Sequence, residues 1–128
     1  MQKNNDCLLI DDDIDDREIF VMCAEKANPG INCRVAENAL VAISLLTETG
    51  NIPAYIFIDV NMPKMNGMEC LKRLKTMEKL KGTIFYMYST TGEDVTVSES
   101  KELGARFLIK PAKPSELVEK LSQIFGSE

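Results

Sequence analysis

The sequence contains no histidine and no tryptophan, and only 6% of its 128 residues are aromatic. The absence of histidine excludes Ser-His-Asp and Cys-His catalysis, and it leaves the usual zinc sites without imidazole ligands. The four cysteines include no C-x-x-C pair, so we interpret them as reduced, small apolar residues of the core. A metal or redox role for the cysteines is therefore disfavoured.

Long apolar runs and an excess of basic charge are also missing. No run approaches the roughly 18 residues of a membrane span, and Met1–Asp6 lacks the charged and apolar regions of a signal peptide. We therefore expect a cytoplasmic protein that does not insert into membranes. The net charge of −5 disfavours direct nucleic-acid binding. One basic cluster is interpreted as a solvated helix face: Lys72, Arg73, Lys75, Lys79 and Lys81.

The sequence does contain a regular alternation of strand and helix patterns. Strands are predicted at residues 7–10, 31–35, 54–60, 83–89 and 107–110, and helices at about 14–28, 38–50, 68–77, 93–103 and 114–125. Such alternation predicts an α/β fold with a five-stranded parallel sheet, right-handed crossovers and helices on both faces. We expect residues 1–128 to form a single domain with a core of about 6–126 and no output domain.

Two of the predicted helices differ in how clearly their apolar residues mark a buried face. In the first, the helical spacing of Ile19, Met22, Cys23 and Ala27 predicts the buried face. The helix at 93–103 has the poorest pattern, because it holds few apolar anchors and several β-branched residues.

Polar residues follow four of the predicted strands. Asp11–Asp13 follow the first, Asp59 ends the third, Ser89 ends the fourth and Lys110 ends the fifth. The carboxyl ends of parallel strands meet at one edge, where open α/β sheets bind ligands. Converging carboxylates raise one another's pKa unless a cation intervenes, and Mg²⁺ is the usual cation beside phosphate.

This combination predicts phosphoryl transfer to Asp59. A carboxylate nucleophile, a metal, the Lys110 ammonium and the Ser89 hydroxyl are the groups that such a reaction needs. Each residue also has a purely structural interpretation. A strand-end aspartate is usually a turn or cap residue, and the Asp11–Asp13 run can simply begin a helix. The joint placement at four strand ends favours the chemical interpretation.

Four motifs carry a resemblance to a known family: Leu8–Asp13, Asp59–Gly67, Tyr88–Thr90 and Lys110-Pro111. Over essentially its whole length, the chain resembles the receiver domain of two-component response regulators and is similar to the single-domain chemotaxis regulator. The resemblance implies a doubly wound (βα)5, flavodoxin-like three-layer sandwich with strand order 2-1-3-4-5.

The resemblance also implies roles for the acidic residues. Asp59 is the phosphoacceptor and becomes 4-aspartylphosphate. Asp12 is the direct Mg²⁺ ligand and Asp11 helps to hold the ion through water, with Mn²⁺ as an alternative metal. The backbone carbonyl of Asn61 completes the protein's share of the coordination.

Three further residues match the family's switching and catalytic positions. Ser89 takes the Thr/Ser switch position, Phe107 the aromatic switch position, and Lys110 the lysine that contacts the acceptor and its phosphoryl group. Two departures fall on the output face. The spacing from Gly104 to Lys110 is one residue shorter than the commonest pattern, and the helix at 93–103 is weak.

The implied function is that of a phosphoacceptor that catalyses its own phosphotransfer and slow autodephosphorylation and is not a conventional enzyme. The phosphoryl group comes from a sensor histidine kinase or a phosphotransfer protein. The signal leaves through altered protein contacts with an unknown downstream target or by onward phosphorelay, from a monomer or a dimer that forms weakly on activation.

Three alternatives compete with this interpretation. A phosphatase of the haloacid dehalogenase type needs a second aspartate as general acid where this chain has Asn61. A flavin-binding flavodoxin needs a hydroxyl-rich phosphate loop where Asp11–Asp13 stand, and these acids repel phosphate. The third alternative is a receiver-like module that binds proteins without phosphorylation, which the intact acceptor set argues against.

Overall fold

The computed structural model describes residues 5–48 and 50–126. Residues 1–4, which belong to the segment expected not to be a signal peptide, lie outside it, as do residues 49 and 127–128. The outermost ends of the expected single domain are therefore not described. A five-stranded, all-parallel sheet has the order β2-β1-β3-β4-β5. Its strands are β1 Asp6–Ile10, β2 Asn32–Ala36, β3 Tyr55–Asp59, β4 Ile84–Ser89 and β5 Arg106–Ile109. This order confirms the predicted fold.

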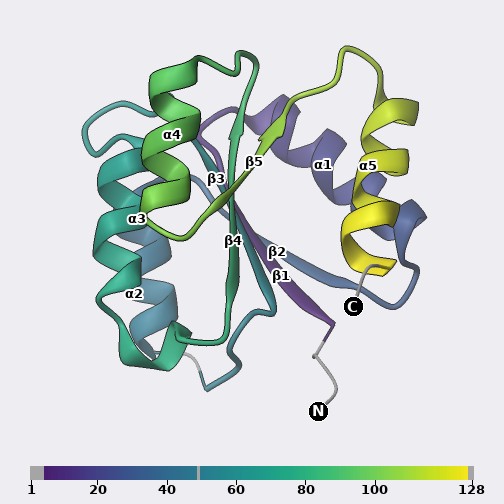
Figure 1. The fold of residues 1–128 in the computed structure, drawn as a ribbon. Helices are drawn as coiled ribbons and strands as arrows, with labels where there is room; N and C mark the ends of the chain where they lie inside the picture. The colour runs from purple at the N-terminus through teal and green to yellow at the C-terminus, as the bar shows by residue number, and fades with distance from the viewer. Residues whose placement is uncertain (1–4, 49, 127–128) are drawn as a thin grey trace.

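Helices cover both faces of the sheet, giving three layers (Figure 1). The helices are α1 Ile14–Ala27, α2 Ala39–Glu48, α3 Gly67–Lys75, α4 Asp94–Glu102 and α5 Pro114–Gly126, with a short 3-10 turn, η1, at Glu78–Leu80. α1 and α5 pack on one face, and α2, α3 and α4 on the other (Figure 1).

The central strand β3 is buried along its whole length because both of its faces are covered, as expected for an uninterrupted apolar strand. Toward α1 and α5 the core is aromatic. The ring of Phe57 lies 4.9 Å from that of Phe20 and 5.2 Å from that of Tyr86. The four cysteines are free, and three of them are buried, which agrees with a packing role.

Side chains and a glycine set the helix boundaries. The Asn38 side chain accepts a hydrogen bond from the Val41 N–H at 2.8 Å and caps α2. α4 ends in a Schellman motif: Gly104 has φ 82°, and the Ala105 N–H bonds to the Ser100 carbonyl at 2.8 Å. The shortened spacing before β5 therefore accompanies an ordinary helix ending that leads directly into the strand.

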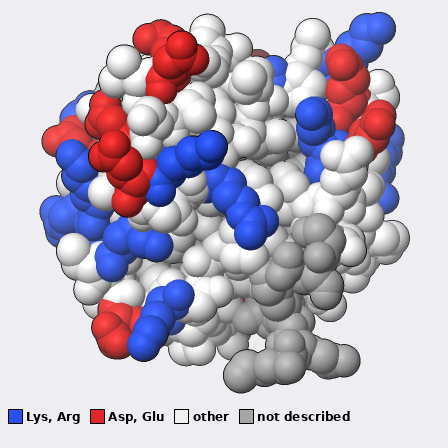
Figure 2. All heavy atoms as spheres, in the orientation of Figure 1, with Lys and Arg blue, Asp and Glu red and all other residues white. Residues whose placement is uncertain are grey.

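Charges of both signs lie over the helices. On the face shown in Figure 2, acidic and basic side chains are interspersed, and no broad area of one sign is visible among the described residues. Lys72, Arg73 and Lys75 are exposed on α3, as predicted. Lys79 also has a structural role, because its Nζ donates to the carbonyls of Leu46 and Thr47 at 2.7 and 3.1 Å at the end of α2. No helix within residues 5–48 and 50–126 combines the length and apolar composition needed to cross a bilayer.

The predicted buried face of α1 is wrong in part. Cys23 is buried, but Ile19 and Met22 are 38% and 46% exposed, and Phe20 and Ala24 face the core instead. The reason is that residues 19–24 are all apolar, so spacing alone does not select a face, and the largest ring takes the interior.

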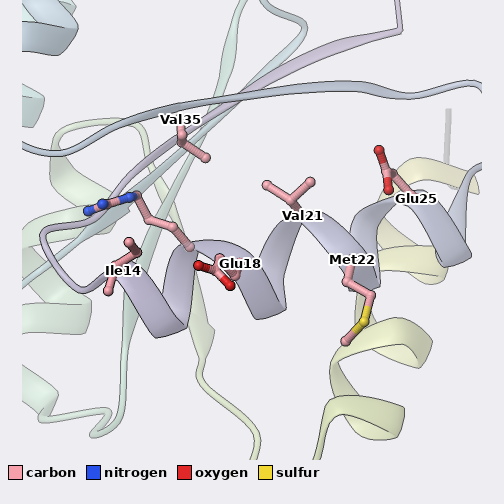
Figure 3. A pocket seen from close by; sticks show the side chains of 7 residues that line it. Ile14, Glu18, Val21, Met22, Glu25 and Val35 are labelled. Atoms are coloured by element: carbon pink, nitrogen blue, oxygen red, sulfur yellow. The ribbon is translucent and has the colours of Figure 1, made fainter.

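This rotation leaves apolar side chains on the outside of α1. Met22, together with Ile14 and Val21 of the same helix and Val35 of β2, lines an open groove of about 440 Å³ between α1 and β2 (Figure 3). The groove lies beside Arg17, whose Nη1 donates to the Asp11 carbonyl at 2.9 Å, but it does not contain the acidic strand ends.

Candidate functional site

The acids that follow β1 have three different environments. Asp11 is fully buried, and its Oδ1 accepts a hydrogen bond from the Asp13 N–H at 3.0 Å. Asp12 is exposed. Asp13 is the N-cap of α1 and accepts from the N–H groups of Asp15 and Asp16 at 2.8 and 3.1 Å. The structural interpretation therefore holds for Asp13, whereas Asp11 and Asp12 remain at the edge of the sheet.

Asp59 is the last residue of β3 and is only 6% exposed. The Val60 N–H bonds to the Tyr88 carbonyl at 3.0 Å, which continues the pairing with β4 just beyond the acid. The Asn61 N–H donates to Asp59 Oδ1 at 3.1 Å and orients the carboxylate. Gly67 packs so closely that a Cβ there would lie 2.3 Å from the Asp59 carbonyl oxygen, so the loop requires glycine.

Lys110 connects β5 to the acids of β1, α1 and β3. Its Nζ lies 3.2 Å from Asp11 Oδ2, 2.9 Å from Asp16 Oδ2 and 3.8 Å from Asp59 Oδ1. The ammonium also lies 4.9 Å from the centre of the Tyr88 ring, within the range of a cation–π contact. The predicted convergence of Asp11, Asp59 and Lys110 is therefore present.

Sequence reasoning missed Asp16. An acid in the first turn of a helix is explained by the helix dipole alone, so the residue type gives no reason to place Asp16 in the site. A usable signal was its place in the first turn of a helix that begins two residues after Asp12, because that turn must lie beside the strand ends. Geometry, not residue type, distinguishes Asp16 from its neighbour Asp15.

Ser89 ends β4 and is 2% exposed. Its Oγ accepts a hydrogen bond from the Thr91 N–H at 3.3 Å, and its carbonyl accepts from the Lys110 N–H at 2.7 Å. Phe107 lies opposite Met87 and is half-buried against the core on the α2, α3 and α4 side. The two predicted switch residues thus stand on neighbouring strands, and their switching roles stay predictions.

Three carboxylates are placed to hold a cation. Oxygen atoms of Asp11, Asp12 and Asp59 all lie within 4.8 Å of one another. Hard divalent ions such as Mg²⁺ prefer oxygen ligands of this kind. The donor set therefore fits the predicted metal, with Asn61 at the start of the adjoining loop.

The electrostatics of the site favour a bound cation. Burial, followed by the charge of Asp11, raises the pKa of Asp59 from 3.8 to about 7, although Lys110 and the Asn61 N–H act in the opposite direction. Burial alone would lower the pKa of Lys110, but the bond to Asp16 and the charges of Asp11 and Asp59 outweigh it and raise that pKa. A charged lysine thus faces the Asp59 carboxyl, which is not fully ionised near neutral pH without a further cation.

The model of the response regulator receiver domain matches residues 7–122. The chain belongs to this family. Membership confirms the resemblance drawn from the four motifs and decides against a haloacid dehalogenase phosphatase or a flavodoxin. The matched receiver domain extends from β1 into α5 and includes every strand end described above.

Individual relatives support the same assignment. The receiver is 34% identical over 118 residues to the transcriptional regulatory protein CpxR homolog of Haemophilus influenzae, covering 91% of this chain but 48% of that protein. It is 32% identical over 93 residues to a chemotaxis protein CheY homolog of Campylobacter jejuni, covering 72% of this chain and 71% of the relative.

Solved receiver structures have the same fold. The chemotaxis protein CheY4 of Vibrio cholerae matches with a TM-score of 0.80 and 27% identity, over 93% of this chain and 97% of that one. The receiver described here therefore spans nearly all of CheY4 but only about half of the CpxR homolog.

Proposed function

We propose that this receiver domain accepts a phosphoryl group on Asp59 in a Mg²⁺-dependent reaction, within a core of residues 6–126 that acts as one domain. The observation that carries the proposal is the meeting of a buried Asp59 with the acids of β1 and with Lys110, whose Nζ lies 3.8 Å from Asp59 Oδ1. A nucleophile, a cation-binding acidic set and an ammonium are together the parts of phosphoryl transfer.

In the proposed step, a carboxylate oxygen of Asp59 attacks the phosphorus atom of the donor. An O–P bond forms as the bond from phosphorus to the donor's nitrogen or oxygen breaks, and the leaving group takes a proton. The Asn61 N–H holds the carboxylate in one orientation during the attack. Lys110 offsets the charge that gathers on the phosphoryl oxygens, and the buried Ser89 hydroxyl lies on the adjacent strand to donate to one of them.

The proposed metal ligands are Asp12 directly, Asp11 through water, Asp59 and the backbone carbonyl of Asn61. The support is the mutual proximity of the three carboxylates and the raised pKa of Asp59. Mg²⁺, or Mn²⁺ in its place, supplies positive charge to the phosphoryl oxygens and keeps the acceptor ionised. Asp11 has a second task here, because it also pairs with Lys110 at 3.2 Å.

A partner must supply the phosphoryl group. The chain has no histidine, so a phosphohistidine donor belongs to a sensor histidine kinase or a phosphotransfer protein in the cytoplasm. We further propose that the aspartyl phosphate is lost by slow autodephosphorylation. The signal leaves by altered protein contacts or onward phosphorelay, with Ser89 and Phe107 as the moving residues and a monomer or weak dimer as the active form.

Phosphorylation with a small donor tests the proposal directly. Acetyl phosphate and Mg²⁺ should add one phosphoryl group, measured by intact mass, and both EDTA and Asp59→Asn should abolish the addition. Asp13→Asn is the matched control, because it removes a nearby acid outside the proposed metal set and asparagine still caps α1. Labelling of the Asp59→Asn protein would show that another residue is the nucleophile. A wild-type protein that is never labelled would favour the phosphorylation-independent binding module.

A further inference from the structure

Lys110 makes its shortest ion pair with Asp16 and not with the proposed acceptor. The Nζ–Oδ distance is 2.9 Å to Asp16 and 3.8 Å to Asp59. Asp16 belongs to helix α1, whereas Asp11 and Asp59 lie at strand ends. The lysine side chain is 12% exposed and that of Asp16 is 41% exposed, so the pair stands at the partly exposed rim of the site.

The surroundings hold the ammonium closer to Asp16 and Asp11 than to Asp59. Asp13 fixes the first turn of α1 by accepting from the Asp16 N–H, which directs this turn toward Lys110. The Tyr88 ring supports the ammonium at 4.9 Å and is itself held edge-on by Phe20 at 5.5 Å.

We propose that Asp16 is a positioning residue that competes with Asp59 for the Lys110 ammonium. When Asp59 gains a phosphoryl group, movement of the ammonium toward the phosphoryl oxygens lengthens its contact with Asp16. The Asp16 carboxylate opposes this movement, since it attracts the ammonium from 2.9 Å away. Asp16 thus limits how strongly the site holds a phosphoryl group, an inference that rests on the function proposed above.

The effect should be moderate because Asp16 is partly exposed to solvent. Removing its charge should strengthen the binding of a phosphoryl analogue about two- to fivefold, the range expected for one screened ion pair. It should leave the fold intact, since the Asp16 N–H keeps its bond to Asp13.

Beryllofluoride, which mimics an aspartyl phosphate, is the probe, titrated into the protein with saturating Mg²⁺. Asp16→Asn should bind it about two- to fivefold more tightly than the wild type. Asp15→Asn is the matched control: it changes the net charge equally, but the Asp15 carboxylate forms no ion pair in the described part of the chain. Equal affinities in the two variants, or weaker binding by Asp16→Asn, would overturn the proposal.

A second comparison separates positioning from a general structural effect. In a Lys110→Met background, Asp16→Asn should no longer change beryllofluoride affinity, because the ammonium for which Asp16 competes is gone. Thermal unfolding of the wild type, of the three single variants and of the double variant checks that each is folded. An effect of Asp16→Asn that persists without Lys110 would contradict competition. If the wild type binds no beryllofluoride, the proposed function itself is contradicted. If the wild type binds it and Asp16→Asn has no effect on the affinity, only this inference is contradicted.

Discussion

Two loops of this receiver leave neighbouring strands and lead into helices of equal length, but they are built differently. The β3–α3 loop follows Asp59, and the β4–α4 loop follows Ser89. Helix α3 starts with a capping box, in which Asn66 and Glu69 bond reciprocally to each other's N–H. The N-cap of α4, Glu93, makes no side-chain capping bond.

Packing follows the same division. Helix α3 buries Cys70, Leu71 and Leu74, whereas Ser100 is the one fully buried residue among the described residues of α4. A buried leucine stabilises a fold by about 1.5–3 kcal/mol, and α4 has no such contribution. The loop that carries the proposed acceptor is therefore fixed, and the loop after the hydroxyl is held weakly. We expect the shape change that follows phosphorylation to occur at α4.

Glycine substitutions should give the largest difference in stability between the two loops. In Gly67→Ala the new Cβ would lie 2.3 Å from the Asp59 carbonyl oxygen and 2.7 Å from the Val60 Cα, and backbone atoms cannot move aside. We expect a loss of about 3 kcal/mol in the free energy of unfolding, measured by urea denaturation, with severely reduced phosphorylation.

The corresponding change in the second loop is the control. In Gly92→Ala the new Cβ would meet Ile109 Cδ1 at 2.9 Å, but this is the end of a side chain that is 52% exposed and can rotate away. The cost should stay below about 1 kcal/mol. Equal losses in the two variants would show that the loops are equally constrained.

The next largest effect should be a difference in the pH dependence of stability between substitutions at Asp59, the end of β3, and at Ser89, the end of β4. The pKa of Asp59 is raised from 3.8 to about 7, so between these values the folded state keeps a proton that the unfolded state has lost. Stability should therefore fall as pH rises through this window. Asp59→Asn cannot ionise, so without divalent cations it should be stabilising by an amount that grows, by on the order of 2 kcal/mol, from pH 4 to pH 8.

Ser89→Ala is the counterpart at the end of β4. It removes the acceptor of the Thr91 N–H at 3.3 Å but no ionisable group. Its effect on the free energy of unfolding, measured by urea denaturation across the same pH range, should be constant within about 0.5 kcal/mol. If the stability difference between Asp59→Asn and the wild type is also independent of pH, the Asp59 carboxylate is ionised in the folded wild type well below pH 7.

Some of these structural features could be predicted from the sequence, and others could not. Apolar strands ending in Asp59, Ser89 and Lys110 predict the sheet and the meeting of these residues, because parallel topology brings strand ends together. Sequence patterns do not show which way a helix is turned. The contact of Asp16 with Lys110 and the burial of Phe20 instead of Ile19 both depend on the rotation of α1, which tertiary packing decides.

Removing a cap from the fixed loop should have a smaller effect. Asn66→Ala deletes the acceptor for the Glu69 N–H and should lower the free energy of unfolding by about 1 kcal/mol. Because this cap ends the loop that begins at Asp59, phosphorylation by acetyl phosphate should also slow. Asn38→Ala removes the equivalent cap of α2 and should cost about as much stability without slowing phosphorylation. Equal labelling rates in the Asn66→Ala and Asn38→Ala proteins would show that the order of the β3–α3 loop does not affect the rate of phosphorylation.

Adding a cap to the weak loop should have the smallest effect and make the comparison sharper. Glu93 already has the extended backbone of an N-cap, φ −65° and ψ 135°, but its side chain does not cap the helix. Glu93→Asp keeps the charge and supplies a preferred capping side chain, so it should stabilise the protein by about 0.5 kcal/mol. Hydrogen exchange in α4, measured with and without beryllofluoride, should then change less than in the wild type, because the start of the helix is held. Glu93→Gln, which adds no cap, should leave that change intact. An undiminished response in the Glu93→Asp protein would show that phosphorylation moves α4 as a whole rather than loosening its first turn.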